Sequence, residues 1–291
     1  MSNMVLMFLM FLVMVSWGGS WINAKVLVRY AAPEQLIFWR FALTTLTLIP
    51  VMIVLRESFR FRRTGFFAAL LGAVILLVYN LFFFMGLNKG LASIGGVLTT
   101  TLIPAVTYLI NKLISRGEFL VKDIIGLCIG AVGAGFILRI WEMDWYALFH
   151  SGNVFFLLAA VTWAVLTNLS ARVKTILSPI GFNFYLSLFT TIFIFVYMKG
   201  DVGSMASFDG LFWLNLFLLA AFATTFGSSV YFICASKLGS DKASSFVFLV
   251  PVSALIFSMV FLGEKVAWST FTGGAIALCA VYLINKKAKA T

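Results

Sequence analysis

The feature that most constrains this chain is a series of long apolar runs that contain no charged residue. A helix needs about 20 residues, at 1.5 Å each, to cross the roughly 30 Å hydrocarbon layer of a membrane. Eight uncharged runs of about this length cover residues 4–23, 64–88, 90–111, 151–171, 175–198, 210–236, 243–263 and 266–285. Two further spans hold charges: 34–55 with Arg40 inside, and 119–138 with Lys122 and Asp123 at the entrance. The sequence therefore predicts an all-α integral membrane protein with ten transmembrane helices.

The composition excludes the main classes of soluble protein. Only 11% of the 291 residues are charged, whereas water-soluble domains carry about 25%. The apolar share of 62% excludes disorder, and the cysteines Cys128, Cys234 and Cys279 lie inside apolar runs rather than in a disulfide framework. A formal charge of +11 would suggest nucleic acid binding in a soluble protein. In a membrane protein these cations face anionic headgroups, so we expect lipid and no nucleic acid among the partners.

The cations are divided unevenly between the two sides of the membrane. Arg40 lies inside a span, and 14 of the other 20 Lys and Arg lie on the side shared by both termini. The opposite side holds the remaining six, which are Lys25, Arg29, Lys89, Arg139, Lys199 and Lys265. Because Lys and Arg near helix ends are retained in the cytoplasm, this division predicts a multi-pass protein of the cytoplasmic (inner) membrane with both termini in the cytoplasm.

The two halves of the chain resemble each other at an offset of 146 residues. The matching pairs are Trp17 with Trp163, Pro33 with Pro179, Thr44 and Thr45 with Thr190 and Thr191, and Gly117-Glu118 with Gly263-Glu264. Pro104 matches Pro251 after a slip of one further residue. Several uncommon residues that share one offset indicate an internal repeat rather than chance likeness between apolar sequences.

The repeat predicts how the halves are arranged. We expect a first repeat over 1–138, a connecting loop over 139–152 and a second repeat over 153–291. Five helices per half is an odd number, so the second half must cross the membrane upside down relative to the first. Inverted repeats of this kind are common in secondary transporters, whose substrate site lies near the midplane between the repeats.

Each half also resembles one EamA unit of the drug/metabolite transporter superfamily. The resemblance is carried by Trp17-Gly18-Gly19, by Arg40-Phe41, and by the long blocks 86–138 and 235–284. It implies a ten-helix fold of two repeats that transports small metabolites, because amino-acid exporters, metabolite carriers and cofactor uptake systems share this scaffold.

The chain departs from the family pattern at two places. The Leu-Gly-Glu motif is intact at 262–264 but reads Arg116-Gly117-Glu118 in the first half. The second half has Leu186-Ser187 where the first has Arg40-Phe41. Any role of Arg40 is therefore not duplicated by the repeat.

Polar groups inside a span are costly, so each is a candidate for substrate binding. Ligand cavities combine apolar and aromatic walls with a few convergent polar groups. The candidates are Trp17, Asn23, Arg40, Tyr79, Asn80, Thr100, Trp163, Asn168, Ser228 and Tyr231. The alternatives are an interfacial belt for the aromatic residues, favoured for Trp21, Tyr30 and Trp39, and back-bonding to their own helix for Ser and Thr.

Arg40 is the sharpest of these candidates. It is the one cation inside a span, where it would meet a carboxylate or phosphate of the substrate. The alternative is a side chain that reaches the outer interface or binds a backbone carbonyl.

Pro104 and Pro251 lie mid-span in equivalent helices. A proline removes a backbone donor and kinks a helix, so each is a candidate hinge for alternating access; a static kink that improves packing is the alternative. Glycines in the fifth and tenth helices favour close packing, which indicates a scaffold role for that pair.

The sequence offers no enzyme chemistry. His150 is the one histidine and lies in a loop, and we find no paired carboxylates, no Cys and His cluster with metal spacing and no phosphate-binding loop. We therefore expect no catalytic residue, no metal and no cofactor. A channel is the alternative from another class, but a charged ring or carbonyl filter motif is absent.

We predict a secondary transporter that moves a small amphipathic metabolite by alternating access. The substrate class expected from the resemblance and the aromatic residues is amino acids or related compounds, exported by a monomer. The alternative is uptake or exchange of a nucleotide-like metabolite such as S-adenosylmethionine.

Overall fold

The computed structural model describes residues 2–60, 62–90, 92–142, 144, 146, 154–203, 208–262 and 268–285, and over these ranges the regular structure is helical. The helices of the first half are α1 (Asn3–Leu27), α2 (Pro33–Val54), α3 (Arg63–Lys89), α4 (Ala92–Ser115) and α5 (Val121–Leu138), followed by the short η1 (Ile140–Glu142). The predicted loop residue His150 and the motif residues Gly263 and Glu264 lie outside the described residues.

The second half repeats the first with two interruptions. It contains α7 (Val154–Val173), α8 (Pro179–Tyr197) and α13 (Trp268–Asn285) as simple helices. One span is built from α9 (Gly210–Phe217), the π-helix η3 (Leu218–Ser228) and α10 (Ser229–Leu238), and another from α11 (Ser240–Ser245), the 3-10 turn η4 (Phe246–Leu249) and α12 (Val250–Leu262). Counting each composite as one, the structure confirms the ten predicted spans.

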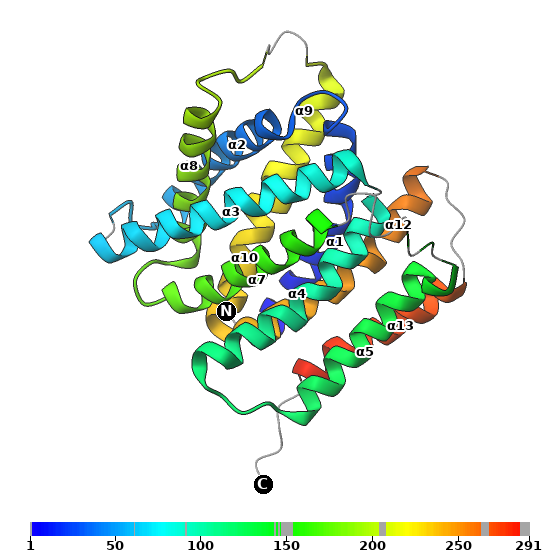
Figure 1. Ribbon diagram of the computed structural model, residues 1–291. Helices are drawn as coiled ribbons and strands as arrows, with labels where there is room; N and C mark the ends of the chain where they lie inside the picture. Colours follow the sequence, from blue (N-terminus) through cyan, green and yellow to red (C-terminus); the bar gives the residue numbers. More distant parts are fainter. Residues whose placement is uncertain are drawn as a thin grey trace.

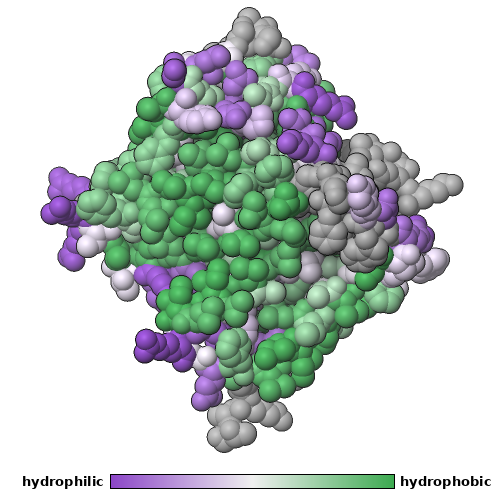
Figure 2. All heavy atoms as spheres, viewed as in Figure 1, coloured by the Kyte–Doolittle hydropathy of each residue, from purple (hydrophilic) through white to green (hydrophobic). Residues whose placement is uncertain are grey.

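Most of the described spans are long and apolar enough to cross a membrane. Seven of them meet both requirements by length and composition, among them the composite Gly210–Leu238. Figure 2 shows apolar surface across the middle of the visible face, with hydrophilic residues gathered toward its edges. The structure confirms a multi-pass membrane fold.

Local sequence signals set where several helices begin. Pro33 and Pro179 each occupy the first position of a helix, where the missing N–H costs no hydrogen bond. The Ser178 hydroxyl accepts from the Gly181 amide and the Asp209 carboxylate from the Phe212 amide, so these side chains cap α8 and α9. The equivalent prolines show the repeat in the local structure.

The inverted repeat is visible in how the halves interlock (Figure 1). α1 packs on α12 as α7 packs on α4, and α2 packs on η3 as α8 packs on α3. The Thr44 hydroxyl donates to the carbonyl oxygen of Ala220 at 3.5 Å, and its counterpart Thr190 donates to that of Ala73 at 3.3 Å. The main interfaces therefore join opposite halves, so neither half buries its apolar faces alone.

α5 and α13 form a separate pair beside the other helices (Figure 1). They cross at Gly133 and Gly273, where a Cβ built on Gly273 would lie 2.5 Å from the carbonyl oxygen of Gly133. This close approach of two backbones requires glycine, which fits the scaffold role predicted for the pair.

The two mid-span prolines have different surroundings. Pro104 lies inside the continuous helix α4. Pro251 is the second residue of α12 and follows the 3-10 turn η4. A proline has no N–H and its ring clashes with the carbonyl four residues earlier, so the chain before Pro251 departs from α-helical geometry. Pro104 and Pro251 are therefore equivalent in sequence, but the helix geometry around them differs.

Candidate functional site

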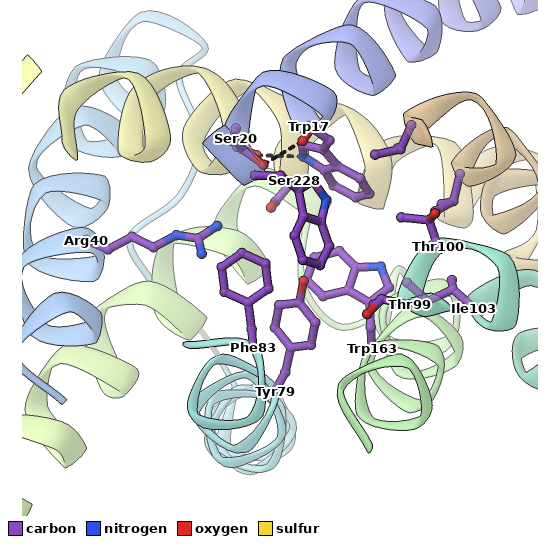
Figure 3. Close-up of a pocket in the computed structure, with 14 residues that line it drawn as sticks. Trp17, Ser20, Arg40, Tyr79, Phe83, Thr99, Thr100, Ile103, Trp163 and Ser228 are labelled. Carbon is purple, nitrogen blue, oxygen red and sulfur yellow. Dashed lines mark hydrogen bonds between the residues drawn. The ribbon is translucent and has the colours of Figure 1, made fainter. Parts of the chain in front are cut away.

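A cavity of about 40 Å³ lies between the two repeats (Figure 3). The first repeat lines it with Trp17, Ser20, Trp21, Arg40, Tyr79, Phe83, Thr99, Thr100 and Ile103, and the second with Trp163, Ala223, Ser228, Val247 and Val250. A cavity of this size holds about three water molecules. A metabolite would enter only after the walls move apart.

Three aromatic rings of the cavity wall, Trp17, Tyr79 and Trp163, cluster with Tyr231 behind them. Trp17 and its counterpart Trp163 lie edge to face, with ring centroids 5.2 Å apart and planes at 84°. Tyr231 packs on Trp17 at 5.1 Å, and Tyr79 packs on Trp163 at 4.8 Å. Because α1 and α7 are equivalent helices, the repeat brings the two tryptophans into contact at its centre.

The two indole N–H groups have different partners. The Trp17 Nε1–H donates to the Ala223 carbonyl oxygen at 2.8 Å. The Trp163 Nε1–H is buried and meets no acceptor with hydrogen-bond geometry, although the Tyr231 hydroxyl lies close to it. A buried donor without a partner is rare and costs about 1–3 kcal/mol. The Trp163 indole N–H is therefore a buried donor beside the cavity, with the Tyr231 hydroxyl close to it.

Arg40 reaches the cavity from α2 and is only 9% exposed. Its Nε and Nη2 donate to the Thr224 hydroxyl at 3.1 and 3.0 Å, and its Nη1 donates to the Asn80 side-chain oxygen at 2.9 Å. The Phe41 and Phe83 rings lie 5.4 and 6.0 Å from its guanidinium carbon. The guanidinium is held by neutral groups only, and two of its five N–H groups have no partner among the described residues.

The π-helix η3 supplies the second repeat's part of the Arg40 site. It presents the Ala223 carbonyl to Trp17 and the Thr224 hydroxyl to Arg40, and the Thr224 carbonyl accepts from the Asn183 side chain at 3.2 Å. π-helical turns are uncommon and occur frequently at functional sites. Sequence reasoning missed this element, and the run Ala-Phe-Ala-Thr-Thr-Phe-Gly carries no recognised signal for it.

The structure places the predicted site residues in three groups. Those that line the cavity are Trp17, Arg40, Tyr79, Thr100, Trp163 and Ser228. Tyr231 lies behind the tryptophans, and Asn80 supports Arg40 while its own side-chain N–H donates to the Leu76 carbonyl. Asn23 and Asn168 do not line the cavity.

Asn168 belongs instead to a polar cluster that joins α4, α7 and α11. Its side-chain N–H donates to the Thr107 carbonyl at 3.1 Å, and its oxygen accepts from the Ser240 hydroxyl at 3.1 Å. Asn111 donates to both carboxylate oxygens of Asp241 at 2.9 Å and accepts from Arg172 at 3.3 Å. These bonds connect the two repeats at one end of the bundle, away from the cavity.

The expectation of an interfacial position was wrong for Trp21. Its side chain is 6% exposed, lines the cavity and packs edge to face on Phe83 at 4.9 Å. The helix α1 continues to Leu27, past the end of the uncharged run, so Trp21 does not lie at the helix end. The Lys25 ammonium in this last turn donates to the Leu87 carbonyl at 2.7 Å. Trp21 is one turn from Trp17 on the same face.

Tyr30 and Trp39 lie near one end of the spans, and their interfacial position stays a prediction. The Tyr30 hydroxyl donates to Asp209 at 3.0 Å, which raises the pKa of Tyr30. The Phe212 amide and this hydroxyl together lower the pKa of Asp209. Trp39 donates to the Val202 carbonyl at 2.9 Å. The Tyr30 bond joins the connection between α1 and α2 to the beginning of α9, and the Trp39 bond joins α2 to the segment that follows α8.

The described lining of the cavity carries positive charge and no negative charge. Among the described residues that line the cavity, Arg40 is the one ionisable at neutral pH, and none is acidic. Groups of three or more His, Cys, Asp or Glu that could hold a metal do not occur in the described ranges. The cavity thus presents a cation and hydrogen-bond donors within aromatic walls, which suits an organic anion.

Comparison with known proteins assigns the family. The profile described as the EamA-like transporter family matches residues 4–139 and 150–286. The chain belongs to the EamA-like transporter family. The resemblance found in the sequence motifs is thereby confirmed, and the protein is a transporter of the drug/metabolite superfamily.

Relatives of this EamA-family chain agree with that assignment. An "uncharacterized transporter" of Archaeoglobus fulgidus is 22% identical and aligns over 93% of this chain and 95% of its own length. A WAT1-related chloroplastic protein of Arabidopsis thaliana is 25% identical over 92% of this chain and 66% of its own. A crystal structure at 13% identity shares the fold with a TM-score of 0.76, covering 96% of this chain and 97% of that one.

If the aromatic wall contacts the substrate, removing either ring should weaken transport. We expect Trp17→Ala and Trp163→Ala each to raise the half-saturation concentration by about 2- to 10-fold, the value of an aromatic contact. Trp268→Ala is the matched control, because Trp268 is 86% exposed and far along the chain from the cavity. Unchanged half-saturation in both cavity variants would show that these rings serve packing alone.

Proposed function

We propose that this EamA-family transporter is a secondary carrier for a small amphipathic metabolite with a carboxylate, of the amino acids or related compounds, which it exports. The observation that carries the proposal is Arg40, a buried cation held by neutral groups in an aromatic cavity between the repeats.

A buried charge is costly unless an opposite charge compensates it. Thr224 and Asn80 orient the guanidinium of Arg40 but leave its charge unbalanced. A substrate carboxylate supplies the balancing charge, and its two oxygens can accept the two unpartnered N–H groups. Aromatic side chains then supply contact area for an apolar substrate body.

The arrangement of the walls supports alternating access. Trp17 belongs to α1 of the first repeat and Trp163 to α7 of the second. A rocking motion of one repeat against the other would separate the two rings and open the cavity at one end. The same rings fill the path in the described conformation, which favours a carrier over an open channel.

The alternative substrate fits this site less well. S-adenosylmethionine has a carboxylate that could pair with Arg40, but it also carries an ammonium and a sulfonium, and the described lining holds a cation and no acid. The aromatic pair could stack on an adenine ring, but the positive centres would have no partner. The lining therefore favours a carboxylate-bearing metabolite with fewer positive centres than S-adenosylmethionine has.

Counterflow in proteoliposomes tests the proposal. Vesicles loaded with an unlabelled substrate should accumulate the labelled substrate transiently, and uptake should saturate. Non-saturating uptake that internal substrate does not stimulate would indicate a pore. A panel of amino acids and related carboxylates, screened first by thermal shift, identifies the compound to use, since a ligand that binds the folded state raises the unfolding temperature.

We also propose that the chain works as a monomer in the cytoplasmic (inner) membrane with both termini in the cytoplasm. The basis of the proposed orientation is the excess of Lys and Arg on one side.

Impermeant thiol labelling tests this orientation. In a background without Cys128, Cys234 and Cys279, we expect Arg62→Cys to be labelled only from the cytoplasmic side and Asp201→Cys only from the other. Arg62 precedes α3 and Asp201 follows α8. Labelling of both from one side would contradict the inverted topology.

A further inference from the structure

We infer that the site prefers an aromatic carboxylate without an α-ammonium group over the corresponding amino acid. The inference rests on the proposed function, since it narrows the substrate class of the Arg40 cavity. The juxtaposition that carries it is an uncompensated cation and unpartnered donors in a cavity whose described lining contains no acid.

The unpartnered polar groups at this site are mainly donors. Arg40 has two N–H groups without a partner, and the Trp163 indole N–H is buried without an acceptor. The two observations are independent, because Arg40 lies on α2 of the first repeat and Trp163 on α7 of the second. Both favour an occupant that is rich in acceptors.

An ammonium group finds only neutral acceptors among the described residues that line the same site. The hydroxyls of Ser20, Thr99 and Thr100 donate to backbone carbonyls and keep lone pairs that can accept, but these oxygens carry no charge. The Ala223 carbonyl already accepts from Trp17. The Thr224 oxygen accepts twice from Arg40. A primary ammonium would lose its water and gain no carboxylate partner among the described residues.

The covalent geometry of an amino acid makes the conflict unavoidable. The α-ammonium and the carboxylate are attached to one carbon, so a carboxylate on Arg40 brings the ammonium within a few ångströms of the guanidinium. Two like charges at that distance repel strongly when both are shielded from water. Removing the ammonium relieves this repulsion and leaves the carboxylate contact intact.

Three probes with one carbon frame separate the contributions of the two charges. These are 3-phenylpropionate, which has only the carboxylate, L-phenylalanine, which has both groups, and phenethylamine, which has only the ammonium. Binding to the purified full chain is measured by thermal unfolding and by tryptophan fluorescence. We expect 3-phenylpropionate to bind at least about tenfold more tightly than L-phenylalanine and phenethylamine not to bind.

Two variants assign the effect to Arg40. Arg40→Gln should lose the 3-phenylpropionate shift, and Arg40→Lys, which keeps the charge, should retain part of it. Trp268→Phe, at an exposed ring, should bind all three probes as the unaltered protein does. If Arg40→Gln fails to fold, the comparison between Arg40→Lys and the unaltered protein remains.

Each outcome separates this inference from the proposed function. Equal or tighter binding of L-phenylalanine would overturn the preference and leave a carboxylate carrier in place. Tighter binding of phenethylamine would overturn both. If no probe binds, the aromatic carboxylate class is wrong, and counterflow with other carboxylates decides the proposed function separately.

Discussion

Replacing Arg40 with glutamine should raise the half-saturation concentration for a carboxylate substrate by about 10- to 100-fold. A hydrogen bond to a charged group contributes about 1.5–3 kcal/mol, and each 1.4 kcal/mol is a factor of ten. The variant also relieves the burial of an uncompensated charge, so we expect the unliganded protein to be at least as stable. Saturation curves of counterflow and thermal unfolding without substrate measure the two effects.

Arg40→Lys is the control for charge alone. A lysine keeps the cation but lacks the planar fork that Thr224 and Asn80 orient, so its effect should fall between those of arginine and glutamine. Normal transport by Arg40→Gln at the same protein level would mean that Arg40 serves the packing of α2 and that substrate binds elsewhere.

Replacing Gly273 with valine should remove most of the folded protein from the membrane. A Cβ at this position would lie 2.5 Å from the Gly133 carbonyl oxygen and 2.9 Å from the backbone nitrogen of Ile137. Neither atom is the end of a flexible side chain, so α13 must shift away from α5. Overpacking of this kind costs about 3 kcal/mol or more, measured as yield and as unfolding temperature in detergent.

Gly210→Val is the matched control for this change. A Cβ on Gly210 meets nothing within 4 Å at the beginning of α9. The yield and unfolding temperature of this variant should stay close to those of the unaltered protein. Equal losses in both variants would attribute the effect to valine in a helix rather than to the α5–α13 crossing.

The fold could be predicted from the sequence because the membrane leaves few choices. Uncharged runs of about 20 residues set the number of spans, and an odd number per repeat sets the inversion. Matched residues such as Pro33 and Pro179 then occupy equivalent helix starts. The interruptions at η3 and η4 could not be read from apolarity, which is the same in a π-helix and an α-helix.

The candidate site could be predicted only in part. Arg40 and the pair Trp17 and Trp163 were recognisable because a cation or a repeated tryptophan inside a span is unusual. Asn168 looked equally suitable, but the direction of its side chain depends on the packing of α7 against α4 and α11. The depth of a residue in the membrane can be predicted by counting along the sequence. The direction in which its side chain points cannot, when the helix is buried on all sides.

The repeat is symmetric in its helices and asymmetric in its chemistry. Arg40 corresponds to Leu186, and the indole of Trp17 is satisfied where that of Trp163 is not. The symmetric helices form the cavity between the halves. The residues that depart from the symmetry determine how a substrate can be oriented in it. The part that sequence periodicity predicts is therefore the scaffold, and the part that it misses is the specificity.

The central claim is that substrate occupies the cavity between the repeats, and protection of Ser228→Cys from a small methanethiosulfonate reagent tests it most directly. Ser228 lines the cavity, and Ser58 in an exposed loop provides the control position. In a background without native cysteines, a saturating concentration of the compound that supports counterflow should slow modification of the cysteine at 228 and leave that at 58 unchanged. Modification at 228 that proceeds at the same rate with and without a transported substrate would contradict the account.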